Sequence, residues 1–394
     1  MSGINEPQTG APGEDRAGSE GDAVGGARAG RDGGAVGGAR AGRDGGAVGG
    51  ARAGRDGGAV GGARAGRESG AVGGAGAGRD GGGLELSRHG FGGAPIGNLF
   101  QEVPEEQARA AIDAAWDSGV RLFDTAPHYG LGLSERRLGA ALKGRSGYVL
   151  STKVGRLLVP APSQGGHDDE GFNVSAELQR VWDFSGDGVR RSLEESLARL
   201  GLPSVDIALI HDPDDHLEQA LAEAYPALAE LRAQGVVKAI GVGMNQWQAP
   251  LRFVQETSID VVMLAGRYTL LDQSGLPLLE ECARRGVRVL AAGVFNSGIL
   301  ATPRPSGTYN YQPAPAPLLE KATRIAEVCE RHGVTLPQAA MAFPLRHPAV
   351  ASVVLGARSP EEVTTNAALW SRPVPDEVWE ELKTEGLLSS EGAG

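Results

Sequence analysis

The sequence has only two cysteines, few aromatic residues and no long apolar run. Cys282 and Cys329 each lie in a helix-like pattern, which fits a reducing compartment better than a disulfide framework. A membrane-spanning helix needs about 20 consecutive apolar residues, and the opening segment MSGINEPQTG lacks the apolar centre of a signal peptide. These absences predict a cytoplasmic protein with no membrane partner.

An excess of positive charge is also missing, because the formal net charge is -11. Residues 1–82 contain ten arginines and ten acidic residues, so the negative excess belongs to the remainder of the chain. A general nucleic-acid-binding protein carries a basic surface. The charge therefore predicts no nucleic-acid partner.

Residues 1–82 lack almost all large apolar side chains. From Ala23 the segment AVGGARAGRDGG recurs every twelve residues in five copies, the last two altered at Glu68, Ser69 and Gly76. Each copy has a single Val as its only large apolar residue, so stacked copies would bury almost nothing. We predict a disordered low-complexity tail that acts as a flexible linker. An Arg-Gly tract can also contact RNA, but the paired acidic residues and the missing aromatic residues weaken that alternative.

Short apolar runs alternate with amphipathic helical stretches over residues 83–394. Helical stretches such as 105–119, 188–201, 227–235 and 278–286 end in Gly, as helix C-termini prefer. The expected strands are residues 90–97, 121–126, 148–153, 206–211, 239–245, 261–266, 288–294 and 352–357. This alternation predicts one (β/α)₈ TIM barrel, an α/β fold, with a doubly wound open sheet as the alternative.

Three expected strands change from apolar to ionisable residues at their C-terminal ends. Asp124 ends the second, Lys153 the third and His211 the fourth, and Tyr129 lies five residues after Asp124. A TIM barrel brings these ends together at its active-site face. A phenol loses its proton near pH 10, and a neighbouring Lys ammonium lowers this pKa while an Asp holds the Lys. We therefore expect Tyr129 to transfer protons and His211 to hydrogen-bond a substrate oxygen.

The segments around these four residues have a family likeness. FDTAPHYGLGLSERRLGAAL, STKVGRLL, LIHDPDD, MLAGRYTLL and VWDFSGDGVRRSLEESLARLGL together resemble the aldo-keto reductase superfamily. They are similar in particular to the branch of L-fucose, D-threo-aldose and L-galactose 1-dehydrogenases, to which pyridoxal 4-dehydrogenase also belongs. The resemblance covers residues 83–385 and implies a catalytic tetrad of Asp124, Tyr129, Lys153 and His211.

The resemblance also implies NAD or NADP as the cofactor. Gly356, Arg358, Glu362 and Asn366 would surround its adenosine half, beside an expected helix N-terminus that favours phosphate. Arg358 suits a ribose 2′-phosphate, whereas Glu362 brings a negative charge close by. The choice between the two cofactors therefore stays open.

The nicotinamide and pyrophosphate contacts are expected from two other segments. By resemblance, Asn245 holds the nicotinamide carboxamide. Many relatives carry a Tyr at the end of the seventh strand that stacks on the nicotinamide, but Ala292 stands there, which leaves Phe295 or Tyr268 for that face of the ring. The loop GVFNSG is expected to contact phosphate through Gly293, Phe295, Asn296, Ser297 and Gly298.

Residues 155–188 form a long insertion at the expected catalytic end. Trp182 and Phe184 in this insertion, with His128 beside Tyr129, are the expected substrate residues, because an aromatic face flanked by polar groups suits a sugar. The alternative is a disordered lid whose Trp and Phe pack on the barrel.

The expected activity is that of an NAD(P)-dependent oxidoreductase acting on a small-molecule substrate, with no metal. The branch favours oxidation of a free aldose of the L-fucose or D-threo type at C1 to its lactone. The alternatives are a pyridoxal 4-dehydrogenase, a general aldehyde or ketone reductase, and a non-catalytic cofactor-binding regulatory subunit like the potassium-channel β subunits. The sequence leaves the oligomeric state open.

Overall fold

The computed structural model describes residues 84–162, 165–309 and 312–389. All of them belong to the second of two units into which the chain divides, residues 73–394. The predicted disordered tail over residues 1–82 lies outside the described residues. No described helix combines the length and the apolar character that crossing a membrane requires.

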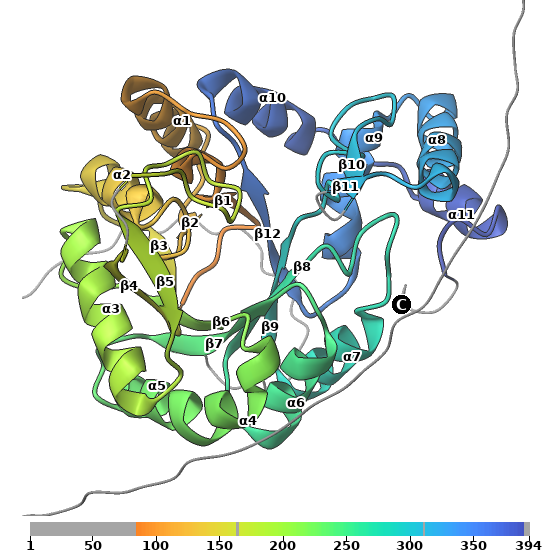
Figure 1. Cartoon of the computed structure of the whole chain (residues 1–394). Coiled ribbons are helices and arrows are strands. Elements are labelled where there is room, and N and C mark those ends of the chain that lie inside the picture. Colours follow the sequence, from red (N-terminus) through yellow and green to blue (C-terminus); the bar gives the residue numbers. More distant parts are fainter. Residues whose placement is uncertain (1–83, 163–164, 310–311, 390–394) are drawn as a thin grey trace, which may run out of the picture. The chain divides into compact units, whose positions relative to one another are not determined.

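Eight parallel strands form a closed barrel (Figure 1). Around the barrel they follow the order β1-β12-β9-β8-β7-β6-β3-β2, and each predicted strand segment overlaps one of them. The strands are β1 (His89–Gly92), β2 (Leu122–Asp124), β3 (Val149–Val154), β6 (Ile207–His211), β7 (Ala239–Met244), β8 (Val261–Ala265), β9 (Arg288–Ala292) and β12 (Val350–Gly356). The predicted TIM barrel is confirmed, and the open-sheet alternative is wrong.

The first strand is shorter than predicted. β1 ends at Gly92, and Pro95–Gly97 form a short 3-10 helix, η1. Proline fixes its own φ and has no N–H group to donate to a neighbouring strand, so the chain turns away from the sheet before Pro95.

Helices surround the barrel (Figure 1), and capping residues set their ends. In α3 (Gly186–Leu200) the Ser185 side chain accepts a hydrogen bond from Gly188 N, and Gly201 ends the helix with a φ of 61°. The other helices are α1 (Glu105–Asp117), α2 (Leu133–Leu142), α4 (Leu217–Gln219), α5 (Tyr225–Ala233), α6 (Gln248–Glu256), α7 (Leu276–Arg285), α8 (Ala316–Arg331), α9 (Leu336–Ala342), α10 (Pro360–Trp370) and α11 (Asp376–Thr384). Three further short segments are η2 (Asp214–His216), η3 (Ala220–Ala224) and η4 (Phe343–Arg346).

Side chains on each strand alternate between two cores, as the pleat requires. On β2, Leu122 belongs to the cluster inside the barrel, whereas Phe123 belongs to the cluster between the strands and the helices. Leu84 joins the inner cluster, and its carbonyl oxygen accepts a hydrogen bond of 2.8 Å from Arg288 at the start of β9. The N-terminal end of the barrel is therefore closed, and open space remains at the C-terminal ends of the strands.

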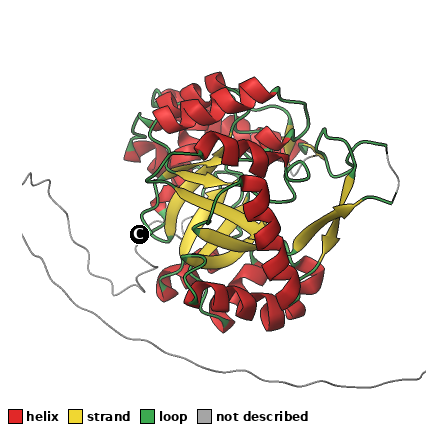
Figure 2. Cartoon of the chain, turned by 90° about the vertical axis from the view of Figure 1, so that its left-hand side faces the viewer, coloured by secondary structure: helices red, strands yellow, loops and turns green. Residues whose placement is uncertain are grey.

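The insertion after β3 contains an antiparallel hairpin, β4 (Arg156–Pro160) and β5 (Leu178–Trp182). The hairpin projects from one end of the barrel (Figure 2). Residues 165–177, which we call the crossing loop, precede β5. A second short pair, β10 (Thr308–Tyr309) and β11 (Gln312–Pro313), follows β9.

Candidate active site

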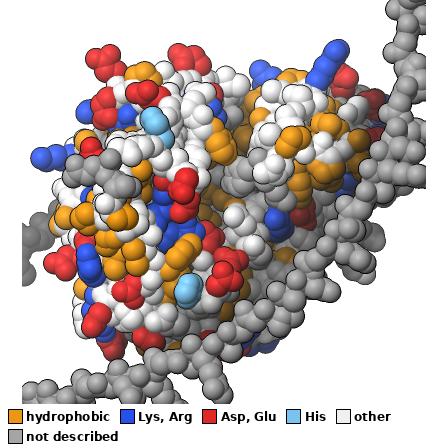
Figure 3. Space-filling view, viewed as in Figure 1, with side chains coloured by type: hydrophobic (Ala, Val, Ile, Leu, Met, Phe, Trp, Pro, Cys, Tyr) orange, Lys and Arg blue, Asp and Glu red, His pale blue; other side chains and the backbone are white. Residues whose placement is uncertain are grey.

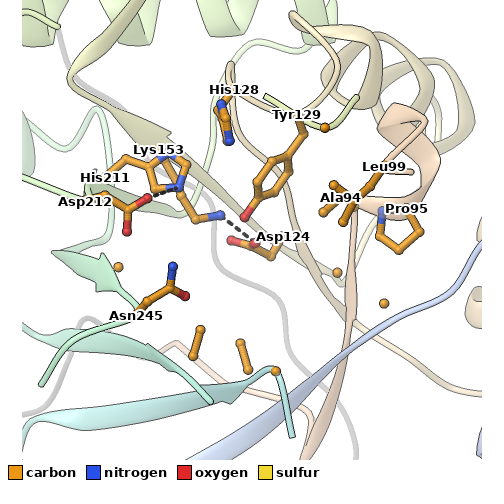
Figure 4. Close-up of a pocket in the computed structure, with 18 of the residues that line it drawn as sticks. Ala94, Pro95, Leu99, Asp124, His128, Tyr129, Lys153, His211, Asp212 and Asn245 are labelled. Atoms are coloured by element: carbon orange, nitrogen blue, oxygen red, sulfur yellow. Dashed lines mark hydrogen bonds and ion pairs between the residues drawn. The ribbon is translucent and has the colours of Figure 1, made fainter. Parts of the chain in front are cut away.

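The C-terminal ends of the barrel strands surround a cavity of about 600 Å³. Acidic and basic side chains gather around the middle of this face (Figure 3). The four residues of the predicted tetrad, Asp124, Tyr129, Lys153 and His211, all line the cavity. Their side chains converge on it from neighbouring elements of the barrel (Figure 4).

Lys153 and Asp124 form a buried ion pair at the wall of the cavity. Lys153 Nζ donates hydrogen bonds to Asp124 Oδ2 at 2.6 Å and to the Thr125 carbonyl oxygen at 2.9 Å. The same ammonium lies 4.6 Å from the centre of the Tyr129 ring. Burial lowers the pKa of Lys153, but Asp124 and Tyr129 more than offset this effect, so the pKa lies above its usual value. Lys153 is therefore charged at neutral pH.

The pKa of the Tyr129 phenol is raised, whereas the sequence led us to expect it to be lowered. Burial raises this pKa, Lys153 lowers it by a smaller amount, and Asp124 raises it further. The effect of Lys153 has the expected direction, but desolvation of the phenolate outweighs it. The phenol therefore holds its proton at neutral pH, and Lys153 limits how far the pKa rises.

His211 and His128 are both neutral at physiological pH. Burial lowers the pKa of His211 well below its usual value, and Arg156 lowers it further. Burial and two neighbouring arginines bring the pKa of His128 to about 2. The two ring centres lie 5.6 Å apart, and neither Nδ1 atom has a hydrogen-bond partner among the described residues. Each imidazole thus keeps hydrogen-bonding capacity that the protein does not use.

Two glycines fix the position of Tyr129. Gly130 has a φ of 64°, and a Cβ atom on it would lie 2.2 Å from the Gly97 carbonyl oxygen. A Cβ atom on Gly97 would in turn lie 2.8 Å from the Tyr129 carbonyl carbon. Only glycine lets the loop after β2 pack this closely on η1. The close contact holds the phenol opposite Lys153.

Three predicted cofactor residues line the cavity on the side away from Tyr129. They are Asn245 after β7, Gly293 after β9 and Gly356 at the end of β12. Asn245 carries its amide into the cavity (Figure 4). The wall beside it is built from small residues, among them Gly243, Ala265 and Ala292. A planar ring can approach such a wall closely, and the Asn245 amide offers a donor and an acceptor, so these residues fit a nicotinamide carboxamide.

The remaining predicted cofactor residues are not among those that line the cavity. The Tyr268 ring packs against the rings of Phe343 and His347, with ring centres 5.1 and 5.7 Å apart. Phe295 packs against the apolar cluster between the strands and the helices. Neither aromatic ring therefore covers the wall at Ala292. The predicted residues outside the lining are Phe295, Asn296, Ser297, Gly298, Arg358, Glu362 and Asn366.

The loop after β9 has an unusual backbone. Gly293, Asn296, Ser297 and Gly298 all have positive φ angles, between 47° and 108°. Two N–H groups of this loop are bonded within it, because Asn296 N donates to the Gly293 carbonyl oxygen at 2.9 Å and Gly298 N to the Phe295 carbonyl oxygen at 3.0 Å. Gly298 has no side chain and open space beside it, which leaves a phosphate group room to approach the backbone there.

α10 begins as predicted, and its first turn contains a paired charge. The Ser359 side chain accepts a hydrogen bond of 3.2 Å from Glu362 N, and Pro360 is the first helical residue. The Glu362 carboxylate accepts a hydrogen bond of 2.9 Å from Arg358 N and lies 3.4 Å from Arg358 Nε. Asn366 lies on the same helix and lines a small hollow beside β1.

The three predicted substrate residues occupy different places. His128 lines the cavity. Phe184 is fully buried, and Trp182 stacks on it at 5.8 Å and on the Arg156 guanidinium at 4.1 Å, so neither reaches the cavity lining. Phe184 thus packs on the barrel, as in the alternative interpretation, whereas Trp182 lies on β5 of the hairpin and is 43% exposed.

Some residues that face the tetrad were not predicted from the sequence. Phe172 of the crossing loop lines the cavity, and its ring lies 6.1 Å from that of Tyr129. Asp169 and Glu170 line the same side. The insertion itself was the signal for these residues, but its composition does not show which part turns inward. Asp212, also in the lining, follows His211 directly and could have been found by its place after β6.

The crossing loop is fastened across the cavity to residues 98–100. Phe100 N donates to the Gly171 carbonyl oxygen, and Asn173 N donates to the Asn98 carbonyl oxygen, both at 2.8 Å. At its base, Asp168 forms an ion pair with Arg180 in which both side chains are 4% exposed. The crossing loop and residues 98–100 therefore form a roof over the substrate side of the cavity.

Residues 89–384 match the Aldo/keto reductase family. The chain belongs to this family. The aldo-keto reductase is 46% identical over 315 residues to D-threo-aldose 1-dehydrogenase from Pseudomonas sp., covering 78% of this chain and 96% of that protein. It is 41% identical to pyridoxal 4-dehydrogenase from Microbacterium luteolum, with 78% and 96% covered. It is 33% identical to L-galactose dehydrogenase from Arabidopsis thaliana, with 73% and 85% covered. The predicted family and branch are confirmed.

A solved structure, that of a glycerol dehydrogenase from Gluconobacter oxydans, has the same fold. It is 24% identical and superposes with a TM-score of 0.61, covering 76% of this chain and 91% of that chain. Family membership makes the aldo-keto reductase an oxidoreductase that uses NAD or NADP. In such enzymes the nicotinamide supplies the hydride chemistry, and the protein supplies binding, orientation and proton transfer.

Proposed function

We propose that the aldo-keto reductase oxidises a free aldose at C1 to its lactone. The observation that carries this proposal is the composition of the cavity on the tetrad side. The rings of Tyr129, His128 and Phe172 form an aromatic wall, and the carboxylates of Glu170 and Asp212 lie beside it. A sugar has an apolar ring face and a rim of hydroxyl donors, which match an aromatic wall and carboxylate acceptors.

Each member of the tetrad has one task in this proposal. A ring nitrogen of His211 donates a hydrogen bond to the C1 oxygen and orients it, and the lowered pKa of this imidazole keeps it from acting as an acid at neutral pH. Tyr129 accepts the hydroxyl proton as a phenolate. Lys153 stabilises that phenolate, and Asp124 holds Lys153. A bound nicotinamide would accept the C1 hydrogen as hydride, and loss of this hydride and of the hydroxyl proton would leave the C1–O bond as the carbonyl of the lactone.

The cofactor is proposed to bind with its nicotinamide against the small-residue wall at Ala292. Asn245 would hold the carboxamide, the loop from Gly293 to Gly298 would contact the pyrophosphate, and residues 356–366 would contact the adenosine half. The paired Arg358 and Glu362 support a preference for NAD, because the Glu362 carboxylate partly neutralises the guanidinium that would bind a 2′-phosphate.

A second candidate is oxidation of pyridoxal. The 41% identity to pyridoxal 4-dehydrogenase favours it, and the Phe172 ring could stack on a pyridine. The aldose is preferred because the relative at 46% identity is an aldose dehydrogenase and because the carboxylates of Glu170 and Asp212 offer acceptors for the hydroxyl groups of a sugar.

Steady-state kinetics test the proposal. A panel of L-fucose, L-galactose, D-arabinose, pyridoxal and a simple aliphatic aldehyde is scanned for reduction of NAD⁺ and then of NADP⁺. We expect the highest kcat/KM for an aldose. A much higher value for pyridoxal or the aliphatic aldehyde would contradict the aldose assignment and leave the oxidoreductase assignment intact.

A further inference from the structure

Acidic side chains gather at the substrate side of the cavity. Asp169 and Glu170 of the crossing loop and Asp212 after β6 all line it, and we call these three residues the acidic rim. Lys153 is the only cation among the described lining residues, and its charge is paired with Asp124. The lining thus offers an incoming substrate no unpaired cation.

The cations behind the acidic rim do not balance it. Arg156 lies 2.6 Å from Asp212 and 3.8 Å from Glu170. Arg180 pairs with Asp168 and lies 3.8 Å from Glu170. The two guanidinium groups lie near three carboxylates, those of Asp168, Glu170 and Asp212. With Asp169 there are four negative charges and two positive charges, which leaves two negative charges in excess.

The neighbouring histidine does not reduce this excess. His128 Nδ1 lies 3.5 Å from Glu170, but the pKa of His128 is lowered to about 2, so the ring is neutral. Asp169 has no ion-pair partner in the described part of the chain. The hydrogen bonds to Asn98 and Phe100 hold the backbone of the crossing loop, which keeps the exposed side chains of Asp169 and Glu170 beside the cavity.

We propose that the acidic rim restricts the aldo-keto reductase to uncharged substrates and excludes phosphorylated and carboxylated forms of the same compounds. This inference rests on the proposed function, since it concerns the substrate class of the same site. Like charges brought together in a cleft oppose binding, because the low-dielectric walls strengthen their repulsion. A neutral polyol meets no such repulsion, and its hydroxyl groups can donate hydrogen bonds to the same carboxylates.

Two pairs of compounds test the proposal. L-galactose and L-galacturonate share a pyranose ring and differ in charge at C6, and pyridoxal differs from pyridoxal 5′-phosphate by the phosphate. The ratio of kcat/KM for the neutral to the anionic member is measured with the full chain and saturating cofactor. For wild type we expect a ratio of about ten or more in at least one pair, decreasing as added salt screens the repulsion.

The variant D169N/E170Q removes two charges from the acidic rim and should lower that ratio about tenfold. The matched control, E194Q/E223Q, changes the net charge equally at exposed positions outside the cavity and the crossing loop, and should keep the wild-type ratio. A wild type that accepts both members equally, or a rim variant with an unchanged ratio, would overturn the proposal. The second result would leave size, rather than charge, as the cause of exclusion.

Calorimetric titration of the same four compounds into cofactor-loaded protein separates this inference from the proposed function. Binding of the neutral members without turnover of any aldose would contradict the proposed function alone. Equal affinity for the neutral and anionic members would contradict the charge selection, whatever the turnover.

Discussion

At Tyr129, burial and a neighbouring ammonium act on one phenol in opposite directions. Burial is the larger effect, so the pKa lies above its usual value. Oxidation needs the phenolate as proton acceptor, and the fraction of phenolate rises with pH until the pH exceeds the pKa. We therefore expect kcat/KM for oxidation to rise through the alkaline range. No inflection is expected near pH 6.5, because His211 is neutral well below that value.

Replacing Lys153 with Met tests the role of the ammonium. The substitution removes the charge that favours the phenolate, so the alkaline rise should move to still higher pH and turnover at neutral pH should fall. The measurement is the pH profile of kcat/KM for wild type and Lys153→Met. An unchanged midpoint in the variant would show that Lys153 does not act through Tyr129.

Replacing Tyr129 with Phe tests the proton acceptor itself. The aromatic ring remains, so the packing against Phe172 is kept, but the hydroxyl is lost. We expect turnover to fall by roughly 10²- to 10⁴-fold, the usual worth of a positioned acid or base, with the cofactor Kd nearly unchanged in a fluorescence titration. Near wild-type turnover would remove Tyr129 from the mechanism.

Glu362 offers a test of cofactor preference. Glu362→Gln keeps a side chain that can hydrogen-bond Arg358 N but removes the charge beside the guanidinium. The ratio of kcat/KM for NADP⁺ to that for NAD⁺ should rise about tenfold. Glu361→Gln, at the next position of the same helix turn, is the control and should change the ratio much less. An equal response of the two variants would argue for a general charge effect.

The residues of the site differ in how well the sequence predicts them. The tetrad is predictable because a strand that ends in an ionisable residue is informative once the strands close into a barrel. Phe172 is not, because a loop aromatic has no periodicity to show which way it faces. Phe184 illustrates the same limit. Its buried ring packs against Gly155 at the other end of the insertion, and no local pattern records that contact.

Among the elements, the crossing loop is held at its base by one buried ion pair, that of Asp168 and Arg180. Breaking such a pair by removing one partner costs about 3–5 kcal/mol, because the other charge stays buried. Asp168→Asn should therefore loosen the crossing loop, raise the KM for the substrate and leave the cofactor Kd unchanged. Limited proteolysis should cut the variant faster within residues 165–177.

An exposed pair provides the control for this variant. Asp187 lies 3.4 Å from Arg190 and is fully exposed, and water screens such a pair so that it contributes little to stability. Asp187→Asn should therefore show wild-type proteolysis and KM. If Asp168→Asn behaves in the same way, the ion pair does not hold the roof.

Strands and helices of the barrel were predictable because their apolar periods differ and their ends carry Gly, Ser or Pro. The path of the crossing loop was not predictable. Its contacts with Asn98 and Phe100 join segments more than 70 residues apart in the chain, and no local pattern records such a contact. The sequence locates the insertion, but it does not show that part of the insertion covers the cavity.

For the whole molecule, we predict that residues 1–82 are dispensable. A variant that begins at Gly83 keeps Leu84, whose buried side chain and bonded carbonyl group close the barrel. It should therefore retain the melting temperature and turnover of the full chain. Loss of either would contradict the linker interpretation of the tail.

A variant that begins at Arg88 is the matched comparison. It loses Leu84, and burying such a side chain contributes about 1.5–3 kcal/mol. We expect its Tm to fall by several degrees relative to the variant that begins at Gly83. Equal Tm values for the two variants would show that Leu84 adds nothing to the barrel.

Leu84 also determines from which side the barrel can be tethered. Its carbonyl group is bonded to Arg288 at one end of β9, whereas Ala292 at the other end of the same strand lines the cavity. A covalent link made just before Leu84 therefore joins the barrel at the end opposite its reacting groups. On an electrode or a resin, molecules attached at this point would all turn their cavities away from the support, so substrate and cofactor would diffuse in from the solution side.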